Sequence, residues 1–175
     1  NLKNQSGGLT FGRRSTVSLM GNWGEVRLGR DYTPGFWNLS KYSAFGTNGV
    51  GSAAGIFYPL KARITHVRAS NSIGYHLPKM GGLFGQVMVA RGEQTGNNDG
   101  NVAGARVGYE AGPFSVAIGT TTTKIAALGD FRQTNIGGSY DFGVVEVMAL
   151  WGENKIGDSK TRSQSIGVQA PVGKA

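Results

Sequence analysis

Cysteine is absent from this 175-residue sequence, which excludes disulfide frameworks, cysteine-ligated zinc sites and cysteine nucleophiles. Charged residues make up only 16% of the chain, against about 25% in ordinary soluble domains. Long apolar runs are also missing, and without a stretch of about 18 apolar residues no transmembrane helix is expected. The chain opens on polar residues rather than on a signal peptide, so we expect a mature or truncated sequence.

Motifs of enzymes and metal sites are missing as well. His66 and His76 lie ten positions apart, which is no ligand spacing, and no nucleophile elbow, Walker loop or catalytic carboxylate pair occurs. The segment 97–101 contains a single acid, too few for a calcium loop. We therefore expect a protein that is not an enzyme, with no catalytic residues, no cofactor and no metal.

Glycine and positive charge are what the sequence has in excess. Glycine occupies 30 of 175 positions, more than twice the share of about 7% in an average protein, and the net charge is +8. The basic residues stand singly, with Arg13 and Arg14 the only adjacent pair, whereas nucleic-acid-binding domains cluster them in runs or on one face. No nucleic-acid partner is expected from this distribution.

Apolar and polar residues alternate with the period of two that is typical of β-strands, and helical periodicity is nearly absent. In the segment 114–119, for example, Phe114, Val116 and Ile118 share one face. Short and long connections also alternate, which predicts an antiparallel up-and-down meander. The pattern predicts nine strands, at 9–20, 24–30, 67–78, 83–92, 102–111, 114–125, 131–142, 143–155 and 162–173.

Three features favour a transmembrane β-barrel over a soluble β-sandwich, which would give the same alternation. The expected strands run about 10–12 residues, longer than the usual 5–6. Their polar face is rich in glycine rather than lysine and glutamate, as suits a lumen. Aromatic residues gather at strand ends, as in a membrane girdle: Phe11, Tyr75, Tyr109, Phe114, Tyr140, Phe142 and Trp151.

Residues 13–31 combine an arginine pair, a short strand, the turn Gly21-Asn-Trp-Gly24 and a strand ending Leu28-Gly-Arg30. This stretch resembles the strand–turn–strand of the trimeric general porins of Gram-negative bacteria, closest to the β-proteobacterial anion-selective type. Residues 67–75 and 166–173 match the same family in the same order. The resemblance covers nearly the whole chain.

The resemblance implies a 16-stranded barrel in the outer membrane, assembled as a homotrimer and surrounded by membrane lipid and lipopolysaccharide. Because 16 strands need about 320 residues, we expect residues 1–175 to be a single but incomplete barrel domain, an internal portion of a longer chain. The family ends on a C-terminal aromatic residue, whereas this chain ends Gly-Lys-Ala, which fits that expectation.

The long connection 31–66 is rich in aromatic residues and cannot be exposed to water without cost. In the resembled family this loop folds into the barrel and narrows the pore; the alternative is an outer loop packed on its neighbours or on a partner. We assign Lys41, Tyr42, Ser43 and Lys61 to the pore loop.

Three arginines are candidates for the constriction. Alternation places Arg68 on the lumen face, and it points Arg14 inward as well, whereas the resemblance matches the pore-facing arginine to Arg13. Both Arg13 and Arg14 therefore remain candidates. Alternation also places Arg106, Glu110 and His76 on the lumen wall.

These expectations together describe a passive diffusion channel for small hydrophilic solutes. Arginines in a narrow channel would concentrate small anionic solutes. The acid-free stretch between Asp31 and Glu93 would strengthen that preference. Two alternatives stay open: a soluble β-sandwich module that binds acidic polymers, and a structural or adhesive barrel that does not conduct.

Overall fold

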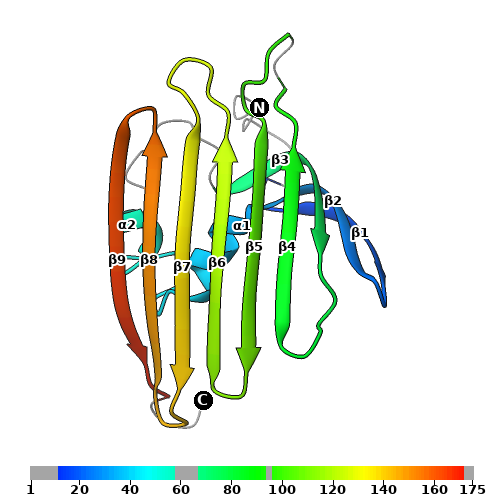
Figure 1. Ribbon diagram of the computed structural model, residues 1–175. Helices are drawn as coiled ribbons and strands as arrows, with labels where there is room; N and C mark the ends of the chain where they lie inside the picture. Colours follow the sequence, from blue (N-terminus) through cyan, green and yellow to red (C-terminus); the bar gives the residue numbers. More distant parts are fainter. Residues whose placement is uncertain (1–11, 58–66, 94–95, 172–175) are drawn as a thin grey trace.

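The computed structural model describes residues 12–57, 67–93 and 96–171. Its strands form a single antiparallel sheet in which every strand pairs with its neighbours in sequence (Figure 1). The strands are β1 (Ser15–Gly21), β2 (Gly24–Tyr32), β3 (Arg68–His76), β4 (Leu83–Ala90), β5 (Val102–Ala111), β6 (Phe114–Thr123), β7 (Phe131–Asp141), β8 (Glu146–Ile156) and β9 (Ser159–Gln169).

The expectation of an all-β, up-and-down meander of nine strands is confirmed. The β-sandwich alternative is wrong, because all strands of the described residues belong to one sheet. The tight β5–β6 and β7–β8 turns lie at one end of the sheet, and the longer β4–β5 and β6–β7 loops lie at the other (Figure 1). The beginning of the first expected strand, residues 9–11, lies outside the described residues.

The register separates two chemically different faces. Gly119, Asn135 and Gly152 are cross-strand partners on one face. Their neighbours Ile118 and Ile136 pair on the opposite face, where both are about 45% exposed. We call these the inner and the outer face. A large exposed apolar face is unfavourable in water and favourable in lipid.

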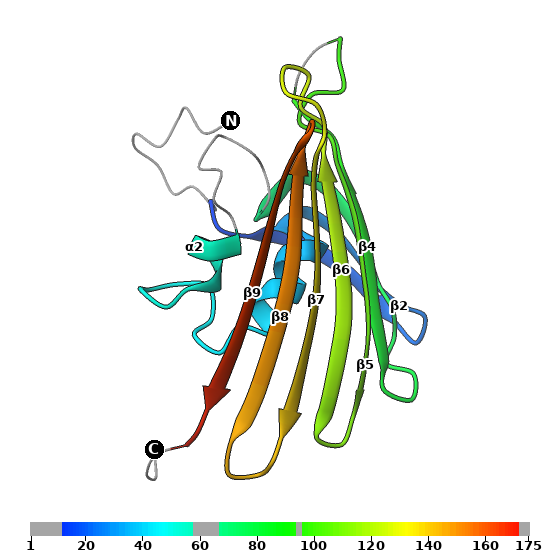
Figure 2. The same cartoon turned by 60° about the vertical axis from the view of Figure 1, so that its left-hand side comes forward.

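Two helices occupy the inner face, where the sequence analysis expected no regular element (Figure 2). They are α1 (Pro34–Lys41) and α2 (Ala53–Phe57), both in the long β2–β3 connection. Thr33 caps α1 by accepting a hydrogen bond from the Phe36 amide at 3.3 Å, and proline at the first position suits a helix start. Neither helix in the described part of the chain is long and apolar enough to cross a bilayer.

A β-bulge interrupts the alternation of β3. Gly29 pairs with Ser72 and Asp31 pairs with Ala69, so β3 has one more residue than β2 in this interval. Asn71 takes up the extra residue with a φ of 53°, a left-handed conformation that asparagine tolerates. Because of this bulge, Ala69 rather than Arg68 shares the face of Ser72. The simple alternation from which we placed Arg68 therefore does not hold across Asn71.

Candidate functional site

The described part of the β2–β3 connection, residues 33–57, lies against the inner face, and we call it the inner loop. Aromatic stacking fixes its start: the Tyr32 ring stacks on Phe36, with centroids 5.1 Å apart, and meets Trp37 edge-on at 5.2 Å. Leu39 and Tyr42 are almost completely buried. This burial explains why an apolar loop is stable here; that the loop folds into a pore and narrows it stays a prediction.

Five wall glycines leave the space that the inner loop fills. A Cβ atom added to any of them would lie 2.3–3.1 Å from an atom of the inner loop, closer than side chains normally pack. We call this set the glycine seat; its members are Gly104, Gly119, Gly137, Gly152 and Gly167, and they face Pro34, Asn38, Tyr42, Phe57 and Ala44 in that order. Each lies on a different strand, from β5 to β9. The glycine richness of the polar face thus has a packing reason.

Buried polar groups attach α1 to the wall. Asn38 donates through Nδ2 to the Asn135 side-chain oxygen at 2.8 Å, and Asn135 donates to the Gly35 carbonyl at 2.9 Å. Both asparagines are fully buried. Since a buried amide without partners is costly, these two hydrogen bonds fix the position of α1 along the sheet.

Further hydrogen bonds attach the rest of the inner loop. The hydroxyls of Tyr42 and Ser115 lie 2.8 Å apart, and burial raises the pKa of the Tyr42 phenol, so Tyr42 stays neutral. Asn154 donates to the carbonyl of Phe57 near the other end of the loop. With Ser163 and Gln169 of β9 donating to Ile56 and Ala44, and Lys41 donating to Glu110 of β5, the inner loop is hydrogen-bonded to five neighbouring strands, β5 to β9.

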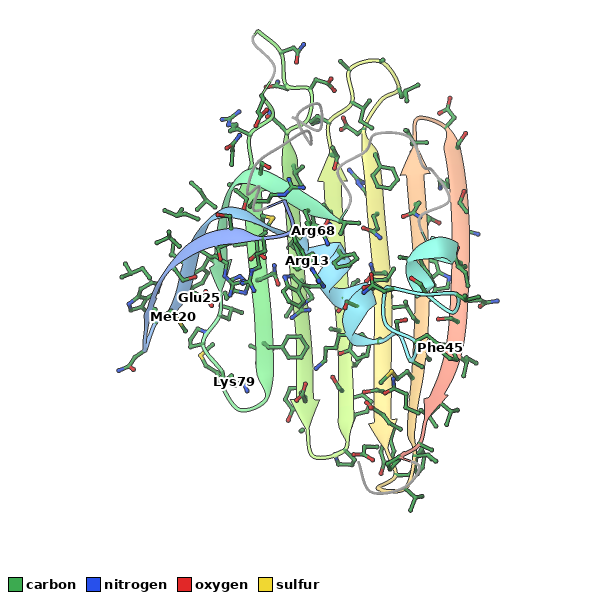
Figure 3. All side chains as sticks on the ribbon, turned by 180° about the vertical axis from the view of Figure 1, so that it is seen from behind. Arg13, Met20, Glu25, Phe45, Arg68 and Lys79 are labelled. Atoms are coloured by element: carbon green, nitrogen blue, oxygen red, sulfur yellow. The ribbon has the colours of Figure 1, made fainter. Side chains whose placement is uncertain are left out.

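Two of the candidate arginines converge on one phenol beside the start of α1 (Figure 3). Arg13 donates from Nε to the Tyr32 hydroxyl at 2.9 Å, and Arg68 donates from Nη2 to the same oxygen at 3.3 Å. The Arg68 guanidinium also lies 4.8 Å from the centroid of the Tyr32 ring. The bond to Tyr32 raises the pKa of Arg13 above its ordinary value, so this residue keeps its charge.

Arg14 has a different neighbourhood. Its Nε lies 3.0 Å from the Asp31 carboxylate, which is only 2% exposed and also binds Arg27 at 2.7 Å. Arg27 in turn pairs with Glu25 at 2.8 Å. Arg14 thus belongs to a neutralised cluster of two acids and two bases, whereas Arg13 and Arg68 have no carboxylate partner among the described residues.

Lys41 and Glu110, assigned from the sequence to the pore loop and to the wall, form an ion pair with 2.5 Å between Nζ and Oε2. The Lys41 ammonium also lies 5.1 Å from the centroid of the Phe84 ring. Arg106 places its guanidinium 5.1 Å from the same ring, and it makes no ion pair in the described part of the chain. The inner loop contains no acidic residue, and its Lys41 forms an ion pair with an acidic residue of the wall, Glu110.

The remaining candidate residues are His76, Ser43 and Lys61. His76 pairs with Gln86 across β3 and β4 and is half-buried, with Nε2 making no hydrogen bond to the described residues. Ser43 is buried and donates to the Gly46 carbonyl at 2.6 Å, so it helps to fold the inner loop rather than facing solvent. Lys61 lies outside the described residues.

The sequence analysis missed Tyr32 as the meeting point of two arginines and Asn38 as the anchor of α1. The sequence contained one usable signal: Thr33 followed by Pro34 is typical of a helix start. Nothing in the sequence indicated that Asn38 contacts Asn135, since the two lie 97 positions apart.

Comparison with known proteins agrees with this geometry. The family model described as Gram-negative porin matches residues 1–175. Outer membrane porin protein 32 of Delftia acidovorans is 38% identical over 181 residues, which cover 95% of this chain and 52% of the relative. The chain thus spans about half the length of this relative.

Solved structures show the same fold. The anion-selective porin from Comamonas acidovorans superposes with a TM-score of 0.86 at 36% identity, over 95% of this chain and 55% of the other. The trimer form of OmpT from Vibrio cholerae gives a TM-score of 0.67 at 14% identity, over 93% and 55% of the two chains. The expected β-barrel fold class and outer-membrane localisation are confirmed, and the chain belongs to the family of Gram-negative porins.

Proposed function

We propose that the complete porin containing this chain is a passive diffusion channel for small hydrophilic solutes and favours anions. The observation that carries this proposal is the meeting of Arg13 and Arg68 at the Tyr32 hydroxyl, beside the inner loop. Guanidinium groups stay charged at every physiological pH and bind carboxylate and phosphate through two parallel hydrogen bonds. In a narrow, partly desolvated channel they raise the local concentration of anions.

The charge balance around the inner loop supports the same preference. Asp31, Glu25 and Glu110 are already paired with Arg14, Arg27 or Lys41. Arg13, Arg68 and Arg106 have no such partner among the described residues. Three guanidinium charges therefore stay uncompensated near the inner loop, and a diffusing anion can balance them transiently.

The inner loop is the constriction in this proposal. It occupies the inner face over β5 to β9, and its cation Lys41 lies over the same Phe84 ring as Arg106. Solutes passing along the inner face would have to pass beside the inner loop and the arginines next to it. Release requires weak binding, and the exposed Arg13 meets this requirement better than a group in a closed pocket would.

Because the chain spans about half of its relatives, the architecture of the whole protein is also proposed here. We infer a closed barrel of 16 strands, since the two edges of a nine-stranded sheet would leave backbone groups unpaired in lipid. A homotrimer is supported by the related OmpT structure, which is described as a trimer. Membrane lipid, lipopolysaccharide and small anionic solutes are the expected partners.

Single-channel recording of the complete porin in a planar bilayer under a salt gradient tests this function. We expect stepwise openings in threes and a reversal potential that favours anions. Arg13→Ala and Arg68→Ala should each move the reversal potential toward zero, while Arg132→Ala, which removes an arginine from the outer face, should leave it unchanged.

Two outcomes would contradict the proposal. Folded, detergent-solubilised protein that gives no conductance would point to the structural barrel. Equal shifts for all three arginine variants would show that selectivity arises from net charge and not from the pair at Tyr32.

A further inference from the structure

Four cationic side chains gather on the outer face at the end of the sheet that bears the long β4–β5 and β6–β7 loops. Arg132 on β7 pairs with Lys155 on β8, which pairs with Lys160 on β9, so the three lie side by side across the sheet. Arg162 follows two residues along β9 on the same face. All four are exposed. We call them the outer cationic patch.

Most of this charge is uncompensated. Arg162 forms an ion pair with Glu153, with Nε and Oε2 2.8 Å apart. Arg132, Lys155 and Lys160 have no ion-pair partner within the described part of the chain. Charged residues on the lipid-facing surface of a barrel are unfavourable at mid-depth and are tolerated near the interfaces. The outer cationic patch therefore needs either an interfacial position or an anionic partner.

The height of the patch places it at such an interface. Tyr140, on the same face of β7 near the tight turns, lies eight residues from Arg132, about 27 Å along a strand and about 20 Å along a barrel axis at usual tilt. Between them β7 carries Thr134, Ile136 and Gly138 on this face, and Ile136 pairs with Trp151 in the middle of the band. The apolar band of such barrels is about 25 Å tall. The patch thus lies at the headgroup level of one leaflet.

The two rims of the outer face differ in chemistry. At the tight-turn end the exposed residues are aromatic, as in a membrane girdle: Tyr109, Phe114, Tyr140 and Phe142. At the other end, cations stand in the corresponding positions of β7, β8 and β9. Long loops of these barrels are extracellular and short turns are periplasmic. The cationic rim therefore meets the outer leaflet.

An open depression of about 740 Å³ adjoins the patch on the outer face. The apolar side chains of Ala105, Val107 and Ile118 form its floor. Toward the long-loop end it is lined by the hydroxyl group of Thr122 and the guanidinium group of Arg132. The order from apolar floor to hydroxyl to guanidinium matches the order from acyl chain to headgroup in a lipid.

We propose that the outer cationic patch binds the phosphate groups of a phosphorylated lipid headgroup in the outer leaflet, with an acyl chain in the adjoining depression. Lysine and arginine form charge-assisted hydrogen bonds to phosphate oxygens, and each adds to the attraction of an anionic membrane surface. This inference rests on the proposed outer-membrane barrel and its orientation. It does not depend on the selectivity of the pore.

Lipid binding by the complete detergent-purified porin tests this site, with diphosphorylated lipid A as the probe and its dephosphorylated form as the comparison. Arg132→Gln, Lys155→Gln and Lys160→Gln combined should weaken binding about 100-fold, and Lys155→Gln alone about fivefold. Lys79→Gln, which removes an exposed lysine near the tight-turn end, is the matched control and should bind like the unmodified protein (Figure 3).

Several results would overturn the site. One is a lipid A affinity of the triple variant within twofold of that of the unmodified protein. Another is equal binding of the dephosphorylated lipid, which would leave only an apolar contact. Displacement of lipid A by millimolar inorganic phosphate would assign the patch to free anions. Dissociation of the oligomer in the triple variant would assign it to a subunit contact. Conductance and reversal potential should stay unchanged in all variants, so failure of lipid binding leaves the pore proposal intact.

Discussion

Replacing Gly137 with alanine tests whether the wall holds the inner loop in position. A Cβ atom at Gly137 would lie 2.3 Å from Cδ2 and 2.6 Å from Cγ of the Tyr42 ring. Carbon atoms pack at about 3.5–4.0 Å, so the ring has to move by about 1.2 Å or more. Tyr42 is 1% exposed and cannot make this movement without displacing the segment that carries it.

The cost follows from two contributions. Overpacking of a well-packed site typically costs about 1–3 kcal/mol. The hydrogen bond between Tyr42 and Ser115, which is 2.8 Å long, contributes about 1 kcal/mol and is lost when the ring moves. A total of about 2–4 kcal/mol lowers the ratio of inner loop packed against the wall (seated) to inner loop detached from it (unseated) by about 30- to 1,000-fold.

Single-channel recording can detect this change, because an unseated loop moves within the pore. We expect Gly137→Ala to replace the steady open level with frequent transitions between levels. Gly138→Ala is the matched control on the same strand: its Cβ would face the other side of the sheet, with 3.3 Å to the Ser115 carbonyl as the closest contact. This variant should record like the unmodified porin.

The reasoning is refuted if Gly137→Ala and Gly138→Ala give the same steady trace. In that case the glycine at 137 would not be required for the inner loop, and the glycine seat would lose its role.

Three more predictions concern the ionisable groups of the inner face. Lys41→Gln should change the unfolding free energy by less than about 1 kcal/mol, because the pair with Glu110 is exposed, but should shift the reversal potential toward cations. Asp31→Asn removes a buried carboxylate that pairs with Arg27 and should lower stability by about 3 kcal/mol in urea unfolding; an unchanged midpoint would contradict the pairing. Since burial raises the pKa of Tyr42 above 10, attachment of the inner loop to the wall should be complete below pH 10 and lost as the pH rises further. In Tyr42→Phe the attachment of the loop should be weaker by about 1 kcal/mol, and single-channel recordings of this variant should not respond to pH.

The strands could be predicted from the sequence because their pattern is local. Alternation identified all nine, and each observed strand overlaps its expected range. The helix α1 was missed, because only 8 residues give too little periodicity to recognise, although Thr33 and Pro34 mark its start. The placement of Arg68 by alternation failed at the bulge, since one residue with positive φ at Asn71 reverses the faces before it.

The site itself depended on contacts that no local pattern reveals. The ion pair of Lys41 with Glu110 joins residues 69 positions apart. The two candidates Arg13 and Arg14 could not be separated from the sequence, because their difference lies in the partner: a phenol for Arg13 and a buried carboxylate for Arg14. The roles assigned to these side chains remain predictions until conductance is measured.

The glycine seat has a consequence for the order of folding. Its members lie on five strands, and the bonds that reach the inner loop span up to 125 positions, from Ala44 to Gln169. Contacts at such sequence separation cost more loop-closure entropy than contacts between neighbouring strands, so we expect them to form later. The inner loop can therefore seat only when β5 to β9 are already paired. We therefore expect the inner face to be unobstructed early in folding and the inner loop to be placed last.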